Sequence, residues 1–159
     1  MFNRKTKIVL LTLVISMLSL TVFYYYHTSK FKRAYIYGTT YNQLNSLLNT
    51  TQYAKNIEHA GFNVDPYYLK INQRAMPIDI GNNIEVSYID KTIVKVMVIL
   101  PNNKDISMTY DSDMNIEYCY GDIDGSRKQL TQDQSKIYDK EIKKTIKNFL
   151  TAVYNDMYR

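Results

Sequence analysis

The chain has 159 residues with one cysteine, and its 20 lysine and arginine residues outnumber its 15 aspartate and glutamate residues. This length suits one ordinary domain beyond any targeting segment, and a lone Cys119 excludes an intramolecular disulfide and a cysteine-based zinc site. Six of the basic residues and none of the acidic ones lie in residues 1–33, which leaves 14 bases and 15 acids in the remainder. The remainder has a formal charge of −1, so composition gives no basic footprint for nucleic-acid binding.

An uncharged apolar run from Ile8 to Tyr26 dominates the N-terminal segment. At the helical rise this run spans about 28 Å, close to the roughly 30 Å hydrocarbon core of a bilayer. A cleavable signal peptide has a shorter apolar core that ends in small residues, whereas bulky Tyr24, Tyr25 and Tyr26 end this one. The pattern therefore favours an uncleaved anchor in residues 1–33 that enters the lipid bilayer through residues 8–26.

Orientation has a weaker signal, because three basic residues flank each end of the apolar run and the positive-inside rule gives no margin. A tail as short as the one before Ile8 usually stays in the cytoplasm. We expect a single-pass protein of the cell membrane with a cytoplasmic N-terminus, and residues 34–159 as one α+β domain outside the cell.

The first soluble segment has apolar residues at mostly helical spacing and stops at Gly61, which predicts a helix over residues 40–60. Gly38 either breaks this helix from the membrane helix or bends one long rod, and the sequence leaves both open. Residues 63–66 predict a turn because Pro66 disfavours helix in the residue before it. Residues 67–71 follow as a short strand.

The clearest sheet signal lies between residues 84 and 120. Four short β-branched or alternating runs, separated by turn-forming residues, predict strands over 84–88, 93–100, 106–110 and 116–120. Their tight connections indicate a four-stranded antiparallel meander. The nearly continuous apolar second run predicts a central strand with both faces covered.

A long closing helix follows the polar loop 121–127. Thr131 with Gln134 three residues later is typical of a capping box at its start. Its apolar residues share one helical face: Tyr138, Ile142, Ile146, Phe149, Leu150, Val153 and Met157. We expect an α+β fold in which a transmembrane helix, a second helix, the meander and this C-terminal helix follow in order, with the last helix packed on the sheet.

Catalytic and cofactor motifs are sparse. The two histidines, His27 and His59, have no neighbour at ligand spacing, the five glycines are scattered, and no G-x-S-x-G elbow occurs. The sequence therefore predicts no catalytic residue, no cofactor and no resident metal. An enzyme that acts on a cell-envelope substrate stays the rival class, with one acidic cluster to carry it: Asp111, Asp113, Asp122 and Asp124.

Residues 111–115 place oxygen ligands at alternate positions, as the start of a calcium loop does. Ile116 stands where such a loop needs glycine, and Asp122 replaces the bidentate glutamate at the twelfth position. We therefore expect a hairpin turn in which Asp and Asn side chains cap the backbone.

Basic residues lie along the closing helix, largely off its apolar face. This possible interaction face consists of Lys136, Lys140, Lys143, Lys144 and Lys147. Contact with an acidic partner or with anionic lipid is one interpretation, and an ordinary solvated helix surface is the other.

A membrane helix that runs into an amphipathic helix and then a four-stranded meander resembles the plan of type IV pilins and pseudopilins. The resemblance implies a structural subunit of an envelope machine. The chain departs from that pattern, because Phe2 follows only Met1, no acidic residue precedes Glu58, and a long helix ends the chain.

The expected membrane tether, the small size of the chain and the near-neutral charge of residues 34–159 together favour a non-catalytic binding or accessory protein. Its partner would be another membrane or envelope protein. The composition is rich in Tyr, Asn, Ile and Lys, which is typical of low-GC bacteria and their mobile elements. One hypothesis is therefore a superinfection-exclusion or immunity protein. Its oligomeric state does not follow from the sequence.

Overall fold

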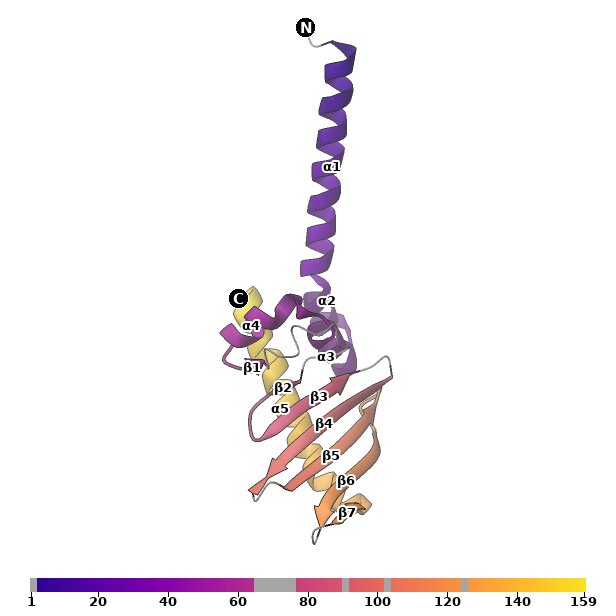
Figure 1. Ribbon diagram of the computed structural model, residues 1–159, viewed down its shortest axis with the longest axis vertical. Helices are drawn as coiled ribbons and strands as arrows, with labels where there is room; N and C mark the ends of the chain where they lie inside the picture. The colour runs from indigo at the N-terminus through magenta and orange to yellow at the C-terminus, as the bar shows by residue number, and fades with distance from the viewer. Residues whose placement is uncertain (1–2, 65–76, 90–91, 102–103, 124–125) are drawn as a thin grey trace.

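The computed structural model describes residues 3–64, 77–89, 92–101, 104–123 and 126–159. An apolar N-terminal helix leads into a domain that consists of an antiparallel sheet, a C-terminal helix and short helices beside the end of the N-terminal helix (Figure 1). The expected α+β class is confirmed at this level.

Helix α1 (Arg4–Thr28) and helix α2 (Lys30–Tyr37) follow each other almost without interruption. The backbone N–H of Ser29 donates to Tyr25 O, and the N–H of Arg33 donates to Ser29 O, both at 3.0 Å, so helical bonding crosses the junction. The stretch Ile8–Tyr26 has a mean hydropathy of 2.2, is wholly unburied, and is long and apolar enough to cross a membrane. Membrane anchors and N-terminal signal sequences share these properties.

Helix α2 is anchored in the core of the domain. Phe31, which lies inside the expected anchor segment 1–33, is fully buried, and its backbone N–H donates to Tyr53 Oη at 3.4 Å. Tyr35 stacks on Tyr154 with ring centroids 4.0 Å apart. Gly38 then ends α2 by taking an extended backbone conformation, and glycine is required there because a Cβ would lie 2.6 Å from Ala34 O and 2.9 Å from Asn42 Cβ. The helix is therefore interrupted at Gly38, which is one of the two alternatives expected from the sequence.

The segment predicted as one helix over residues 40–60 forms three pieces: α3 (Thr40–Leu48), a 3-10 turn (Thr51–Tyr53) and α4 (Ala54–His59). The single-helix prediction is wrong because short polar side chains compete for the backbone at the break. Asn49 Nδ2 donates to Asn45 Oδ1, and Thr50 Oγ1 accepts from the N–H of Gln52. Gly61, at φ 92°, ends the segment as expected.

The sheet has seven strands in sequential antiparallel order: β1 (Asn63–Val64), β2 (Ile78–Asp79), β3 (Ile84–Ile89), β4 (Ile93–Leu100), β5 (Lys104–Asp111), β6 (Ile116–Ile123) and β7 (Ser126–Gln129). The four predicted strands are β3 to β6, so the prediction of four was wrong in number. The polar segment expected as a loop forms the end of β6 and strand β7, whose described side chains are all exposed. Strands β1 and β2 have two residues each, too few to show a period.

Several expected features fall on residues that are not described: the strand at 67–71, the end of the turn at 65–66, the connections at 90–91 and 102–103, and Asp124. Asn63, expected in that turn, belongs to β1 and pairs with Asp79.

Strand β4 is central, but the expectation that both its faces are covered is wrong. Val94, Val96 and Val98 face the core, whereas Lys95 and Ile99 on the other face are exposed, Ile99 by 47%. The sheet has helical cover on one face alone among the described residues, because α5 packs on the side opposite Lys95 (Figure 1).

Helix α5 (Gln132–Tyr158) closes the core. The predicted capping box is present, with Thr131 accepting from Gln134 N and Gln134 Oε1 accepting from Thr131 N. The predicted apolar face is buried at Ile142, Ile146, Phe149, Leu150 and Val153 and half-buried at Tyr138 and Met157. The helix runs from the far end of the sheet back to the base of α1, so the C-terminus lies near the end of α1 (Figure 1).

Candidate functional site

Two adjoining cavities form a groove along α5, and they share Asn115 and Lys143. The cavity nearer the N-terminal end of α5 has a volume of about 400 Å³ and lies between this helix and β6. The second cavity, of about 520 Å³, lies between α5, the turn that joins β5 to β6, and helices α2 and α3. Three stretches of the chain therefore build this α5 groove: residues 35–43, 113–130 and 132–150.

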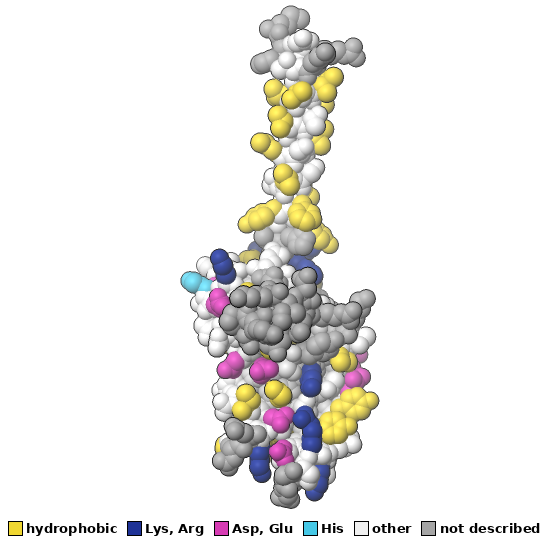
Figure 2. All heavy atoms as spheres, viewed as in Figure 1, with side chains coloured by type: hydrophobic (Ala, Val, Ile, Leu, Met, Phe, Trp, Pro, Cys, Tyr) yellow, Lys and Arg dark blue, Asp and Glu magenta, His cyan; other side chains and the backbone are white. Residues whose placement is uncertain are grey.

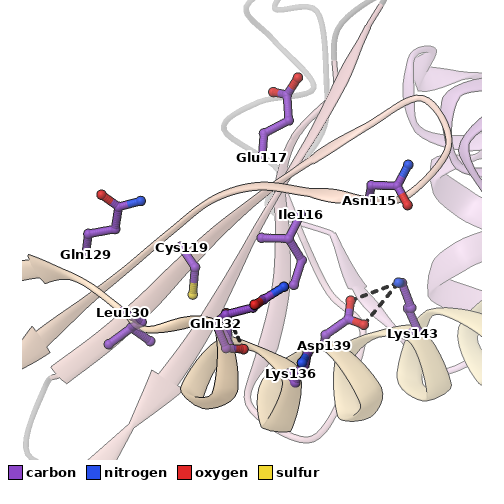
Figure 3. Close-up of a pocket in the computed structure, with 11 residues that line it drawn as sticks. Asn115, Ile116, Glu117, Cys119, Gln129, Leu130, Gln132, Lys136, Asp139 and Lys143 are labelled. Atoms are coloured by element: carbon purple, nitrogen blue, oxygen red, sulfur yellow. Dashed lines mark hydrogen bonds and ion pairs between the residues drawn. The ribbon is translucent and has the colours of Figure 1, made fainter.

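Polar side chains dominate the lining of the α5 groove. Tyr35, Thr40, Gln43, Asp113 and Met114 line the second cavity, and Gln132, Ser135, Lys136 and Asp139 line the first. Figure 3 shows Ile116 and Cys119 of β6 pointing toward α5, whereas Glu117 and Gln129 point away from it. The groove therefore presents hydroxyl and amide groups together with three ammonium groups and three carboxylates, those of Asp113, Glu117 and Asp139.

Three of the five lysines predicted as an interaction face line the α5 groove. Lys143 Nζ lies 3.0 Å from each carboxylate oxygen of Asp139, so its charge is balanced locally (Figure 3). Lys136 lies 3.6 Å from exposed Asp133. Lys147 has no acidic partner within 4.0 Å among the described residues. The ammonium of Lys147 is therefore available to a ligand.

The remaining two lysines of the predicted face, Lys140 and Lys144, are exposed but do not line either cavity. The structure therefore divides the face: positions 136, 143 and 147 share the groove side of α5, and positions 140 and 144 do not.

Tyr110 lies buried beneath the groove. Lys143 Nζ lies 5.8 Å from the ring centroid of Tyr110, and the Tyr110 hydroxyl donates to Met108 Sδ at 3.7 Å. Burial, reinforced by the nearby Asp139 carboxylate, raises the pKa of Tyr110 far above its ordinary value, so the phenol stays neutral. Burial also raises the pKa of the Cys119 thiol, which fits the expected strand residue.

The turn that joins β5 to β6 is organised by Asp111. The N–H groups of Asp113 and Asn115 each donate to Asp111 Oδ1 at 2.8 Å, and Asn115 Nδ2 donates to Oδ2 at 3.1 Å. These bonds, above all that from the Asn115 backbone, hold the pKa of Asp111 below its usual range. The expected hairpin turn is confirmed, and it places Asn115 at the junction of the two cavities.

The acidic cluster of the rival enzyme hypothesis is not assembled among its described members. Asp111 and Asp113 lie in the turn before β6, while Asp122 lies near the other end of that strand. Six strand residues separate the two places by roughly 20 Å. Within the described ranges, no group of three or more His, Cys, Asp or Glu side chains is arranged to hold a metal ion.

His59 lies outside the groove, at the end of α4. Its Nδ1 lies 2.7 Å from Asp156 Oδ1 on α5, so His59 joins two helices at the end of the domain next to α1. The side chain of His27 is not described.

Sequence reasoning located the lysines but missed the opposite wall, which consists of Tyr35, Thr40, Gln43 and Asn115. These residues carry no motif, and only the packing of α2 and α3 beside the β5–β6 turn brings them together. No protein-family model, no curated protein sequence and no solved structure matches this chain.

Proposed function

We propose that this chain is a membrane-tethered, non-catalytic binding protein whose α5 groove holds a polar segment of another membrane or envelope protein. The observation that carries the proposal is the pair of adjoining cavities that share Asn115 and Lys143. The apolar run Ile8–Tyr26 supports the tether.

The lining of the groove suits a hydrogen-bonding ligand that carries a carboxylate for Lys147. Gln132 offers an amide donor and acceptor, and Gln43 and Asn115 offer amide oxygens that can accept from a peptide main chain, while Gln43 Nε2 and Asn115 Nδ2 donate to oxygens of the protein itself. Lys143 and Lys147 are four residues apart on α5, about 6 Å along the helix axis. An extended peptide repeats its same-side residues at a similar 6.6–6.8 Å spacing, so an acidic side chain bound to Lys147 would place the next same-side residue beside the Lys143–Asp139 ion pair.

The groove would be presented at a defined height above the bilayer. Tyr158 at the end of α5 lies beside Phe31 of α2, with ring centroids 6.5 Å apart. Lys147 lies about 16 Å and Lys136 about 33 Å along α5 from Tyr158. A partner would therefore be met close to the membrane, as suits another protein of the same membrane. We propose that the domain lies outside the cell and the N-terminus in the cytoplasm.

Site-specific photocrosslinking in intact membranes tests the groove. A photoreactive residue replaces Lys147 or Gln132 in the groove, and Lys95 on the exposed face of β4 serves as the matched control position. We expect both groove positions to crosslink the same discrete protein, and Lys95 to crosslink it weakly or not at all. Equal crosslinking from all three positions, or none from the groove, would overturn the proposal.

An exclusion role is one biological setting for such a binding protein, proposed from the tether, the size and the composition. Cells that express the chain should then admit DNA of some phage or conjugative elements poorly, and a Lys143→Glu, Lys147→Glu variant should restore entry. Unchanged DNA entry across a broad panel would remove this setting but leave the groove proposal intact.

A further inference from the structure

Basic side chains gather at the end of the domain that adjoins α1. Exposed Lys30, Lys32 and Arg33 lie on α2, exposed Lys55 lies on α4, and exposed Arg159 follows α5. Figure 1 shows α2, α4 and the C-terminus together at the base of α1, and Figure 2 shows dark-blue side chains where the rod meets the domain. Elements from both ends of the chain therefore form one basic surface.

Few acidic residues oppose this basic surface. Glu58 and Asp156 are the acids of α4 and of the last turn of α5, and Asp156 is already bound to His59 at 2.7 Å. Residues 34–159 as a whole carry 14 bases and 15 acids. The positive charge next to the anchor is thus a local feature of an otherwise balanced domain.

The short distance in sequence between the apolar run and α2 determines how far the basic surface lies from the hydrocarbon core. Lys30 and Arg33 follow Tyr26 by four and seven residues, about 6 to 10 Å along the helix. The polar headgroup layer extends roughly 5 to 8 Å beyond the hydrocarbon core on each side. Backbone hydrogen bonds from Ser29 to Tyr25 and from Arg33 to Ser29 connect α1 and α2 across the break at Ser29, so these positions lie close to the end of the apolar run.

Contacts hold the basic groups in place. The Arg33 guanidinium lies 4.4 Å from the ring centroid of Tyr26, and Lys32 Nζ lies 5.4 Å from that of Tyr158. Tyr158 in turn packs against buried Phe31. The bases of α2 are therefore tied both to the end of the apolar run and to the end of α5, beside Arg159.

We propose that this basic surface docks on anionic phospholipid headgroups and holds the domain against the bilayer. The proposal rests on the membrane tether of the proposed function and is independent of the groove. Each lysine or arginine near an anionic membrane surface strengthens the binding equilibrium by about fivefold at low salt. Neutralising Lys55 and Arg159 together should thus lower the ratio of docked to undocked domains by about 25-fold.

The test uses the full chain in nanodiscs made of phosphatidylcholine alone or with phosphatidylglycerol. A fluorophore on Gln52→Cys, an exposed position before α4, reports quenching by nitroxide groups on lipid headgroups. The variant Lys55→Gln, Arg159→Gln is compared with Lys140→Gln, Lys144→Gln, which removes the same charge from exposed positions elsewhere. We expect quenching to require phosphatidylglycerol, to fall as salt is raised, and to fall in the first variant alone.

Equal quenching in both lipid mixtures, or equal loss in both variants, would overturn the proposal. Extraction of the chain from cell membranes by alkaline carbonate would overturn the tether, and this proposal with it. Retention of the chain with lipid-independent quenching would overturn the docking surface alone, and the crosslinking experiment on the groove would be unaffected.

Discussion

Replacement of Phe31 by alanine tests whether helix α2, which follows the apolar N-terminal helix, is an integral part of the folded domain. The Phe31 side chain is fully buried, and four tyrosine rings surround it with centroids 6.0 to 6.5 Å away: Tyr35, Tyr53, Tyr154 and Tyr158. Phe31→Ala removes the ring from the centre of this cluster. Truncation of a buried phenylalanine costs about 3–5 kcal/mol through lost burial and the cavity left behind.

A loss of that size is a large part of the roughly 5–15 kcal/mol that stabilises an ordinary domain. The measurement is the free energy of unfolding of the full chain in nanodiscs, from urea titration followed by the near-UV circular dichroism of tyrosine. Tyr37→Ala on the same helix is the matched control, because Tyr37 is 85% exposed and its loss should cost no more than about 0.5 kcal/mol.

Two outcomes would refute the reasoning about Phe31. One is a Phe31→Ala variant that unfolds at the same urea concentration as the parent chain. The other is a fragment that begins at Ala34, and so lacks Phe31, with unchanged stability. Phe31→Leu, which keeps most of the apolar volume, should lie between the parent and the alanine variant.

Three further predictions concern the helix cap, a buried phenol and the thiol. Thr131→Ala should lower the free energy of unfolding by about 1 kcal/mol, because it removes one half of the capping box. Thr131→Ser should keep most of the stability that the cap provides. An equal loss in both variants would contradict a capping role. Burial, with smaller contributions from Tyr53 and Tyr154, raises the pKa of Tyr158 to about 12. The stabilisation that comes from the neutral phenol is therefore complete below pH 10 and is lost as the pH rises from 10 to 12. The melting temperature of the Tyr158→Phe variant should accordingly fall less steeply than that of the parent chain between pH 10 and pH 12. Parallel declines in the two proteins would exclude Tyr158 as the cause. Cys119, 4% exposed and with a raised pKa, should react with a thiol reagent far more slowly in the folded chain than in urea; equal rates would contradict its burial.

Strong periodicity made much of the fold predictable. The alternation in β3, the β-branched run of β4 and the apolar face of α5 each persist long enough to define a period. Strand β7 has no such signal, because its sequence Ser-Arg-Lys-Gln is wholly polar and its structure comes from pairing with β6. The prediction that both faces of β4 are covered failed for the opposite reason. The exposed residue Ile99 is apolar, so the sequence of β4 resembles that of a strand buried on both faces.

The candidate site was predictable on one side only. Positions 136, 140, 143 and 147 are separated by nearly whole helical turns, so spacing places them on one side of α5, but it does not show that Lys140 lies outside the groove. The wall across from them depends on Gly38, whose missing Cβ lets α3 fold back beside α2 and brings Thr40 and Gln43 to the groove. Contacts of this kind arise from tertiary packing, which residue spacing does not encode.

If the run Ile8–Tyr26 spans a bilayer, the short connection from α1 through Ser29 into the core gives that bilayer mechanical leverage over the rest of the molecule. A transmembrane helix tilts by about 20° on average, and more when its apolar length exceeds the membrane thickness. With α2 fixed in the core through Phe31, the domain would turn with the helix. Over the roughly 40 Å length of α5, a 20° tilt displaces the far end by roughly 14 Å. Membrane thickness would thereby set the direction in which the domain points.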